Sequence, residues 1–318
     1  MHSGAKRLLL LAIVSAIILT PVLNWIVHTH SGKYFNGYYL GITIDIAINI
    51  ILAVSLNLIN GHTGQFSLGH AGFMAVGGYS AAKLTLALSS ATPVWAQPIL
   101  FSAALLLGGI TAATAGLAVG LPTLRLRGDY LAIVTLGFGE IIRVIFQTTE
   151  FFGAATGLPG IANWTNFGWA WSLAAVTIFV VACLVNSTYG RGFIAVHDDE
   201  VAASAIGINP TRYKVTAFVI GAFFAGIAGA LFAHHKRFLS PTSFDFMKSI
   251  DIVVMVIFGG MGRTPGVIAA AIVLTILPET LRSFAEYRMI IYALLIIGLM
   301  MLRPQGLFNF SKSRVVKA

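Results

Sequence analysis

Apolar stretches, each about as long as a bilayer is thick, recur along almost the whole chain. Hydrophobic residues make up 57% of the 318 residues and charged residues only 10%, which is more apolar surface than a soluble domain can expose without aggregating. Stretches of about 20 residues fit spanning helices, whereas the short alternating segments of a barrel are absent. The sequence predicts an all-α fold, a polytopic helical bundle forming a single transmembrane domain over residues 1–318.

The basic residues give this bundle an expected direction, because Lys and Arg gather at the cytoplasmic ends of spans. Arg125 and Arg127 mark an inner loop, and the first apolar stretch has no cleavage site and is expected to stay in place. Full spans are expected at Leu8–Val27, Tyr38–Ile59, Gln97–Leu121, Tyr130–Thr148, Trp171–Val185, Val215–Ala233, Val267–Leu277 and Met289–Leu302. Both termini are then expected in the cytoplasm.

Two further stretches predict broken or re-entrant segments, which brings the expected number of membrane segments to about ten. Gly61–Leu88 is rich in glycine, and each glycine weakens a helix by about 1 kcal/mol relative to alanine. Ile250–Phe258 is too short to cross alone and is followed by the glycine-rich Gly259–Gly266. Such backbone is tolerated in a membrane where protein encloses it.

Several polar residues lie in these apolar surroundings. Asn57, Gln65, Ser67 and His70 are candidates for the wall of a translocation path, although hydrogen bonding between helices remains open as the alternative for Asn57. The histidines at 62 and 70 are eight residues apart and no carboxylate accompanies them, so no metal site is predicted.

Charged residues inside the expected spans are few. Asp45 and Asn49 lie one helical turn apart and predict a stripe that faces protein or water, while Asp251 is either a cavity residue or solvated at the headgroup level. Glu140 and Arg143 have the i, i+3 spacing of an intramembrane ion pair. So few titratable groups argue against a proton or sodium pump.

No catalytic pattern accompanies these spans. The chain has no G-x-x-x-x-G-K-[ST] phosphate-binding loop, no G-x-S-x-G motif and a single cysteine, so neither ATP binding by that route nor an enzyme is predicted. The net charge of +9 does not indicate nucleic acid, because the basic residues are scattered singly at segment ends.

A polar interruption, Arg191–Tyr213, carries a helix signal of its own. Asp198 and Asp199 can cap a helix start, and Gly207 can end the helix before the next one begins. The predicted helix has about two turns, which is too short to be stable alone. It either docks on a partner or lies on the membrane surface.

Five stretches together resemble the permeases of bacterial branched-chain amino acid ABC importers, the LivH/LivM family. They are Leu52–Ala82, Leu121–Arg143, Tyr189–Asn209, Val256–Gly266 and Leu302–Phe308. The Leu-Arg-x-Arg-Gly segment within the second stretch favours the LivM type.

The resemblance implies that residues 187–213 form a cytoplasmic coupling loop. Permeases of ABC importers carry an E-A-A-x-x-x-G motif whose short helix seats in a groove of the ATPase. Glu200 stands one position early here, and Val201 occupies the usual place of the acidic residue. The residues expected at the ATPase contact are Asp198, Asp199, Glu200, Ala202, Ala203, Ile206 and Gly207.

The resemblance also implies an assembly in the bacterial inner membrane, surrounded by lipid. Its other parts would be a homologous LivH-type permease, two cytoplasmic ABC ATPases and a periplasmic substrate-binding protein. ATP would be bound by the ATPases, so no cofactor is expected in this chain. The implied substrates are branched-chain amino acids. Similar permeases import urea and short-chain amides, and a channel or facilitator that needs no partner is a further alternative.

Overall fold

The computed structural model describes residues 37–89, 92–123, 129–281, 293–294 and 297–298. These residues are helical or irregular, and their one β-type pairing is an isolated bridge between Leu158 and Leu239. The all-α prediction is confirmed for this part of the chain. The expected span Leu8–Val27, most of the expected span Met289–Leu302, the basic pair Arg125 and Arg127, and both termini lie outside the described residues. The direction of the chain and the total of about ten segments therefore stay predictions.

Five helical segments of the described residues are long and apolar enough to cross a membrane: Gly37–His62, Val94–Thr123, Tyr130–Thr148, Phe167–Val185 and Pro210–Lys236. The principal helices are α2 (Gly37–Asn57), α3 (His70–Leu88), α4 (Gln97–Thr123), α5 (Asp129–Thr148), α6 (Phe167–Val185), α7 (Thr188–Asp198), α8 (Glu200–Ala205), α9 (Pro210–Lys236), α10 (Phe246–Gly259) and α11 (Thr264–Thr280). Short turns of helix are η1 (Leu58–His62), η2 (Val94–Ala96), η3 (Glu150–Phe152), η4 (Ala154–Thr156) and η5 (Pro241–Phe244).

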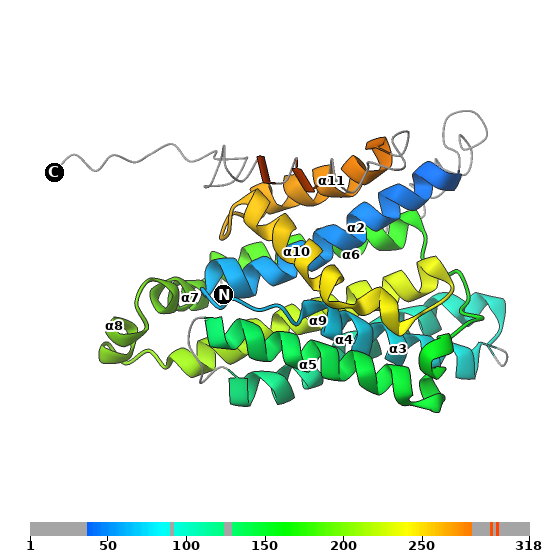
Figure 1. The fold of residues 1–318 in the computed structure, drawn as a ribbon, viewed down its shortest axis with the longest axis horizontal. Coiled ribbons are helices and arrows are strands. Elements are labelled where there is room, and N and C mark those ends of the chain that lie inside the picture. The colour runs from blue at the N-terminus through cyan, green and yellow to red at the C-terminus, as the bar shows by residue number, and fades with distance from the viewer. Residues whose placement is uncertain (1–36, 90–91, 124–128, 282–292, 295–296, 299–318) are drawn as a thin grey trace.

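Helix α2 runs through the middle of the described bundle. It contacts α6, α9, α10 and α11, and Figure 1 shows α11 on one side of it, α3, α4, α5 and α9 on the other, and α10 crossing it. Every residue from Ile46 to Asn57 is buried. A helix that is apolar all round is stable only when it is enclosed in this way.

The two irregular stretches differ in how far they depart from a helix. In Gly61–Leu88 the interruption is confined to Thr63–Gly69, after which α3 is continuous. The helix α10 has 14 residues and is longer than the predicted Ile250–Phe258. At about 1.5 Å per residue it still falls short of a bilayer core about 30 Å thick.

Three glycines bring α3, α4 and α9 into backbone contact. A Cβ atom on Gly77 would lie 2.2 Å from Cα of Gly226, and one on Gly226 would lie 2.3 Å from the carbonyl oxygen of Gly108. A Cβ on Gly108 would lie 2.7 Å from the carbonyl oxygen of Gly77. Small residues allow helices in membranes to pack this closely.

This junction gives a test of the packing. We expect Gly77→Ala to destabilise the bundle by about 1–3 kcal/mol, because the new methyl group overlaps the α9 backbone. The measurement is thermal unfolding of the purified chain in detergent. Gly137→Ala in α5 is the matched control, since its Cβ would meet nothing within 4 Å. Equal melting temperatures for the two variants would contradict the close contact.

Candidate functional site

The four candidate path residues gather where the chain breaks between α2 and α3. Asn57 ends α2, Gln65 and Ser67 lie in the irregular stretch, and His70 begins α3. All four side chains are buried within the chain. The break therefore brings polar groups from 14 positions of sequence into one region of an otherwise apolar interior.

Two of these residues hold the break to neighbouring segments. Oδ1 of Asn57 accepts a hydrogen bond from the backbone N–H of Gly262 at 2.8 Å, which ties the end of α2 to the turn between α10 and α11. The backbone N–H of Ser67 donates to Oδ1 of Asn60 at 3.2 Å. The side-chain oxygen of Asn57 is thus used in a hydrogen bond between a helix and a turn, whereas its side-chain nitrogen has no hydrogen-bond partner among the described residues.

The other two make short local contacts. Nε2 of His70 lies 2.9 Å from Oγ of Ser55, and Nε2 of Gln65 donates to Oγ1 of Thr63 at 2.9 Å. Each of the four candidates keeps one buried polar atom without a hydrogen-bond partner among the described residues: Asn57 Nδ2, Gln65 Oε1, Ser67 Oγ and His70 Nδ1. Such atoms are costly to bury without a partner, and none of the four residues lines either of the two cavities described below.

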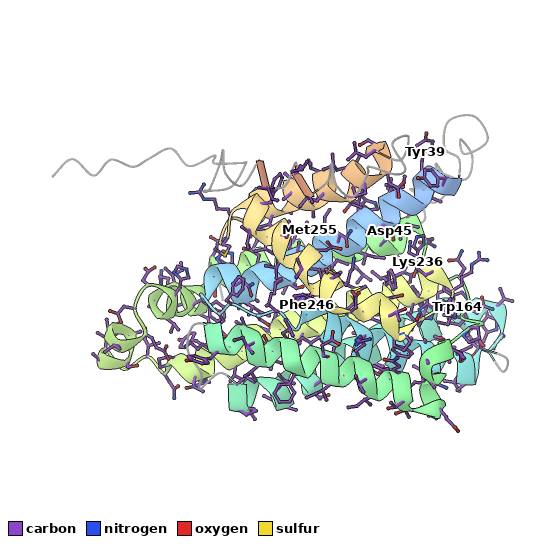
Figure 2. The ribbon with its side chains drawn as sticks, in the orientation of Figure 1. Tyr39, Asp45, Trp164, Lys236, Phe246 and Met255 are labelled. Atoms are coloured by element: carbon purple, nitrogen blue, oxygen red, sulfur yellow. The ribbon has the colours of Figure 1, made fainter. Side chains whose placement is uncertain are left out.

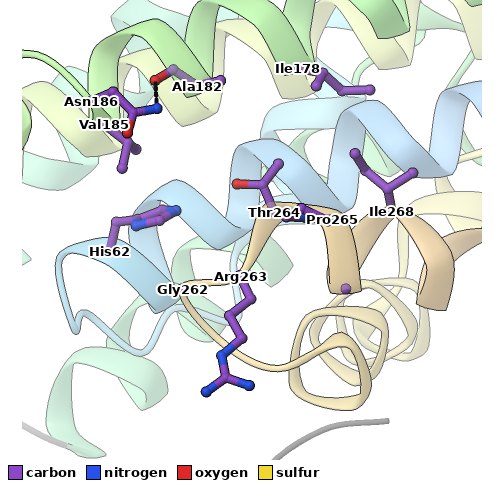
Figure 3. A pocket seen from close by; sticks show the side chains of 11 residues that line it. His62, Ile178, Ala182, Val185, Asn186, Gly262, Arg263, Thr264, Pro265 and Ile268 are labelled. Atoms are coloured by element: carbon purple, nitrogen blue, oxygen red, sulfur yellow. Dashed lines mark hydrogen bonds between the residues drawn. The ribbon is translucent and has the colours of Figure 1, made fainter. Parts of the chain in front are cut away.

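A cavity of about 540 Å³ opens beside this break (Figure 3). Its wall combines His62 from the end of η1, Asn186 after α6, and the turn Gly262–Gly266. Asn186 directly precedes Ser187, which caps α7, so the cavity lies at the end of the bundle where α7 and α8 project. Asn186 and Arg263 of this wall were not predicted from the sequence. The glycine-rich turn before Arg263 is the signal that could have indicated Arg263.

The short helix predicted after Asp199 is present as α8. Oδ1 of Asp199 accepts from the N–H groups of Val201 and Ala202 at 2.8 and 3.0 Å, which makes Asp199 the N-cap. Gly207 follows the helix with a φ of +87°, a left-handed conformation that favours glycine. Asn209 then caps α9 through Arg212 N–H.

The expectation that Asp198 also caps α8 is wrong, because Asp199 alone is the N-cap. Asp198 is the last residue of α7, and its Oδ1 lies 3.2 Å from Nδ1 of His197. Helix α7 was not predicted, although Ser187 is a typical N-cap residue. In the structure its hydroxyl oxygen accepts a hydrogen bond from the N–H of Gly190. Phe193 anchors α7 by edge contacts with the rings of Tyr189 and Tyr213.

The expected ATPase-contact residues differ in accessibility. Ala203 is buried at 2% exposure, so its side chain faces the chain itself. Ala202 and Gly207 are exposed, and the large apolar residues Val201 and Ile206 are 67% and 76% exposed. Val201 in α8 and Ile206 at its C-terminal cap are therefore left largely uncovered by the described residues.

Helix α8 is fastened to α9 by one ion pair. Oε2 of Glu200 accepts from Nζ of Lys214 at 2.8 Å, and the Lys214 side chain is only 10% exposed. The pair joins the first residue of α8 to the second turn of α9. Glu200 thus has a role inside the chain that spacing alone did not indicate.

Glu140 and Arg143 of α5 form the pair that their spacing predicts. Nε of Arg143 donates to Oε2 of Glu140 at 2.7 Å, and both side chains are partly buried. Their mutual neutralisation lets α5 carry two charges in an apolar segment.

Comparison with known proteins agrees with this architecture. Residues 38–303 match the family model described as branched-chain amino acid transport system, permease component. The chain is 37% identical over 312 residues to the high-affinity branched-chain amino acid transport permease LivM of Salmonella typhimurium, covering 86% of this chain and 71% of that protein. The probable LivM of Methanocaldococcus jannaschii is 26% identical over 282 residues, covering 77% of this chain and 81% of that protein.

The LivH relatives match less of the chain. LivH of Escherichia coli is 29% identical over 140 residues, covering 43% of this chain and 44% of that protein. No solved structure matches the chain. The resemblance to LivM-type permeases is confirmed, and the family is one of membrane transport permeases, in agreement with the apolar helices. The chain therefore belongs to the family of branched-chain amino acid transport system permease components.

Proposed function

We propose that this chain is a permease subunit of an ATP-driven importer that moves branched-chain amino acids across the bacterial inner membrane. The LivM relatives carry that substrate class in their names, and the family match spans most of the chain. The proposed coupling to the ATPase rests on one observation. Val201 in α8 and Ile206 directly after it are exposed apolar residues, and the Glu200–Lys214 ion pair anchors this helix to the bundle.

The proposed assembly contains a LivH-type permease, two cytoplasmic ABC ATPases and a periplasmic substrate-binding protein. The separate LivH relatives support a second, related permease. ATP binds to the ATPases, so this chain holds no cofactor of its own. The end of the bundle that carries α7 and α8 then faces the cytoplasm.

In the proposed mechanism the ATPase grips α8. When the ATPases close on ATP, the pull passes through the Asp199 cap and the Glu200–Lys214 ion pair into α9. Because α9 meets α3 and α4 at backbone distance, the three helices move together as a rigid body. In this mechanism the path through the bundle opens alternately to the two sides.

The break between α2 and α3 supplies the proposed path. Asn57, Gln65, Ser67 and His70 each offer one unpaired polar atom there. A passing amino acid presents hydrogen-bond donors and acceptors on its backbone that can satisfy them. The role is weakly selective, which suits a system whose binding protein selects the solute.

Two variants of α8 test the coupling. We expect Val201→Asp and Ile206→Asp to lower ATP-dependent leucine uptake about tenfold or more, because a carboxylate cannot occupy the apolar groove. Uptake is measured in proteoliposomes that contain the whole importer. Ser243→Asp, an exposed residue of η5 at the opposite end of the bundle, is the control. Ala203 is a poor probe of docking because it is buried.

The same preparation separates the alternatives. Undiminished uptake by both aspartate variants would contradict docking through α8. Leucine flux through this chain alone, without nucleotide, would indicate a channel or facilitator, and uptake of urea in place of leucine would indicate an amide importer.

The anchor of α8 gives a second prediction. Lys214→Met removes the partner of Glu200, so the amide hydrogens of α8 are expected to exchange about fivefold faster, in line with an ion pair worth about 1 kcal/mol. Hydrogen exchange read by mass spectrometry over residues 200–205 measures this. Arg212→Met removes a cation from the same end of α9 and serves as control. Unchanged exchange in Lys214→Met would show that the ion pair does not hold α8.

A further inference from the structure

A second cavity, of about 350 Å³, lies between α2, α9, α10 and α11. Its polar lining consists of Asp45, Asn49, Lys236, Lys248, Asp251 and Glu279, with Thr275 beside Asn49. Asp45 lies in the first half of α2 and Lys236 ends α9, whereas α8 adjoins the start of α9. Because Lys236 and α8 lie at opposite ends of α9, the cavity is toward the end of the bundle opposite to α8, where Figure 2 shows Asp45 and Lys236 near each other.

Two of its charges neutralise each other. Nζ of Lys236 lies 2.8 Å from Oδ2 of Asp45, and Nε2 of His235 lies 3.7 Å from Oδ1 of the same carboxylate. Glu279 accepts a hydrogen bond from the hydroxyl of Tyr38. These contacts join α2 to α9 and α11 and account for one cation and two carboxylates of the lining.

Two other charges face the same space without an ionic partner. Nζ of the half-buried Lys248 donates to Oδ1 of Asn49 at 3.3 Å, and no carboxylate of the described residues lies within ion-pair distance of it. Asp251, one turn further along α10, makes neither a hydrogen bond nor an ion pair with the described residues. The ammonium and the carboxylate thus line one wall but do not pair with each other.

Opposite charges held apart on one wall favour a ligand that carries both signs. Lys248 is half-buried, so its ammonium group is costly to leave without an anion, whereas Asp251 is exposed to the cavity. A ligand with only one charge would satisfy one of the two groups and leave the other. The lining also includes the apolar side chains of Ile48, Phe232, Met255 and Leu274. A volume of about 350 Å³ lies within the range of about 300–1,000 Å³ that small-molecule sites have.

We propose that this cavity binds a free hydrophobic amino acid as its zwitterion. Lys248 contacts the carboxylate, Asp251 contacts the ammonium group, and the apolar wall receives the side chain. The proposal rests on the proposed importer function and deepens it, because it places the site for incoming substrate at the end opposite to the ATPase contact. Urea, which carries no charge, leaves both groups unsatisfied.

The test is competition binding to the full chain in lipid nanodiscs. Tritiated leucine is displaced by leucine, by leucine amide, which lacks the carboxylate, or by 4-methylpentanoate, which lacks the ammonium group. We expect leucine to compete about tenfold or more better than either analogue, as the loss of one charge-assisted contact predicts.

Neutralising either charge is expected to abolish the preference for leucine over one analogue and to keep its preference over the other. Lys248→Met removes the advantage of leucine over leucine amide, and Asp251→Asn removes its advantage over 4-methylpentanoate. Lys83→Met and Glu150→Gln make the same charge changes outside the cavity lining and are expected to keep both preferences. Lys248→Arg and Asp251→Glu preserve the charges, and they are expected to bind leucine even if the neutral variants fold poorly.

The outcomes separate the site from the function. If the wild-type chain binds no leucine, or if both preferences survive in the neutral variants, the site is refuted. Leucine uptake by the complete importer in proteoliposomes, measured in parallel, reports on the function alone. Normal uptake by the importer together with unchanged preferences in the neutral variants would contradict the proposed site but not the proposed function. Absence of leucine uptake by the wild-type importer would contradict the proposed function.

Discussion

Backbone contact among α3, α4 and α9 is the constraint on which the rest of this structure depends. Within a bilayer there is no hydrophobic force to press apolar helices together, so close packing must come from shape. Gly77, Gly108 and Gly226 supply that shape, because each leaves room for the backbone of a neighbour. With these three helices locked, α2 can be enclosed on every side, and a polar break can follow it without exposing its backbone to lipid.

The two polar regions of the bundle differ in how their groups are satisfied. At the break, the side chains of Asn57 and His70 each make one hydrogen bond, and each keeps one polar atom without a hydrogen-bond partner among the described residues. In the cavity beside α10, Asp45 is fully engaged while Lys248 and Asp251 are not engaged with any carboxylate or cation of the described residues. Both arrangements leave selected groups available inside a low-dielectric protein, where an incoming polar molecule gains most from meeting them.

Sequence patterns predicted the helical class, the five long apolar segments and α8 with its Asp199 cap, because each depends on local periodicity or capping. They could not predict which face of α8 is buried, since Ala203 is covered by contacts distant in sequence. Asp251 was left open between a cavity and solvent for the same reason. No pattern in the sequence indicated Lys248, although the fold places its ammonium group against Asn49 of α2.

Helix α9 has a further consequence for how the two ends communicate. It is a single unbroken helix of 27 residues, about 40 Å long, with Lys214 near one end and Lys236 at the other. In the proposed mechanism, a displacement at its first turns is transmitted along the helix axis toward the charged cavity. One continuous helix then links the proposed ATPase contact to the proposed substrate site, without a series of rearranging side chains between them.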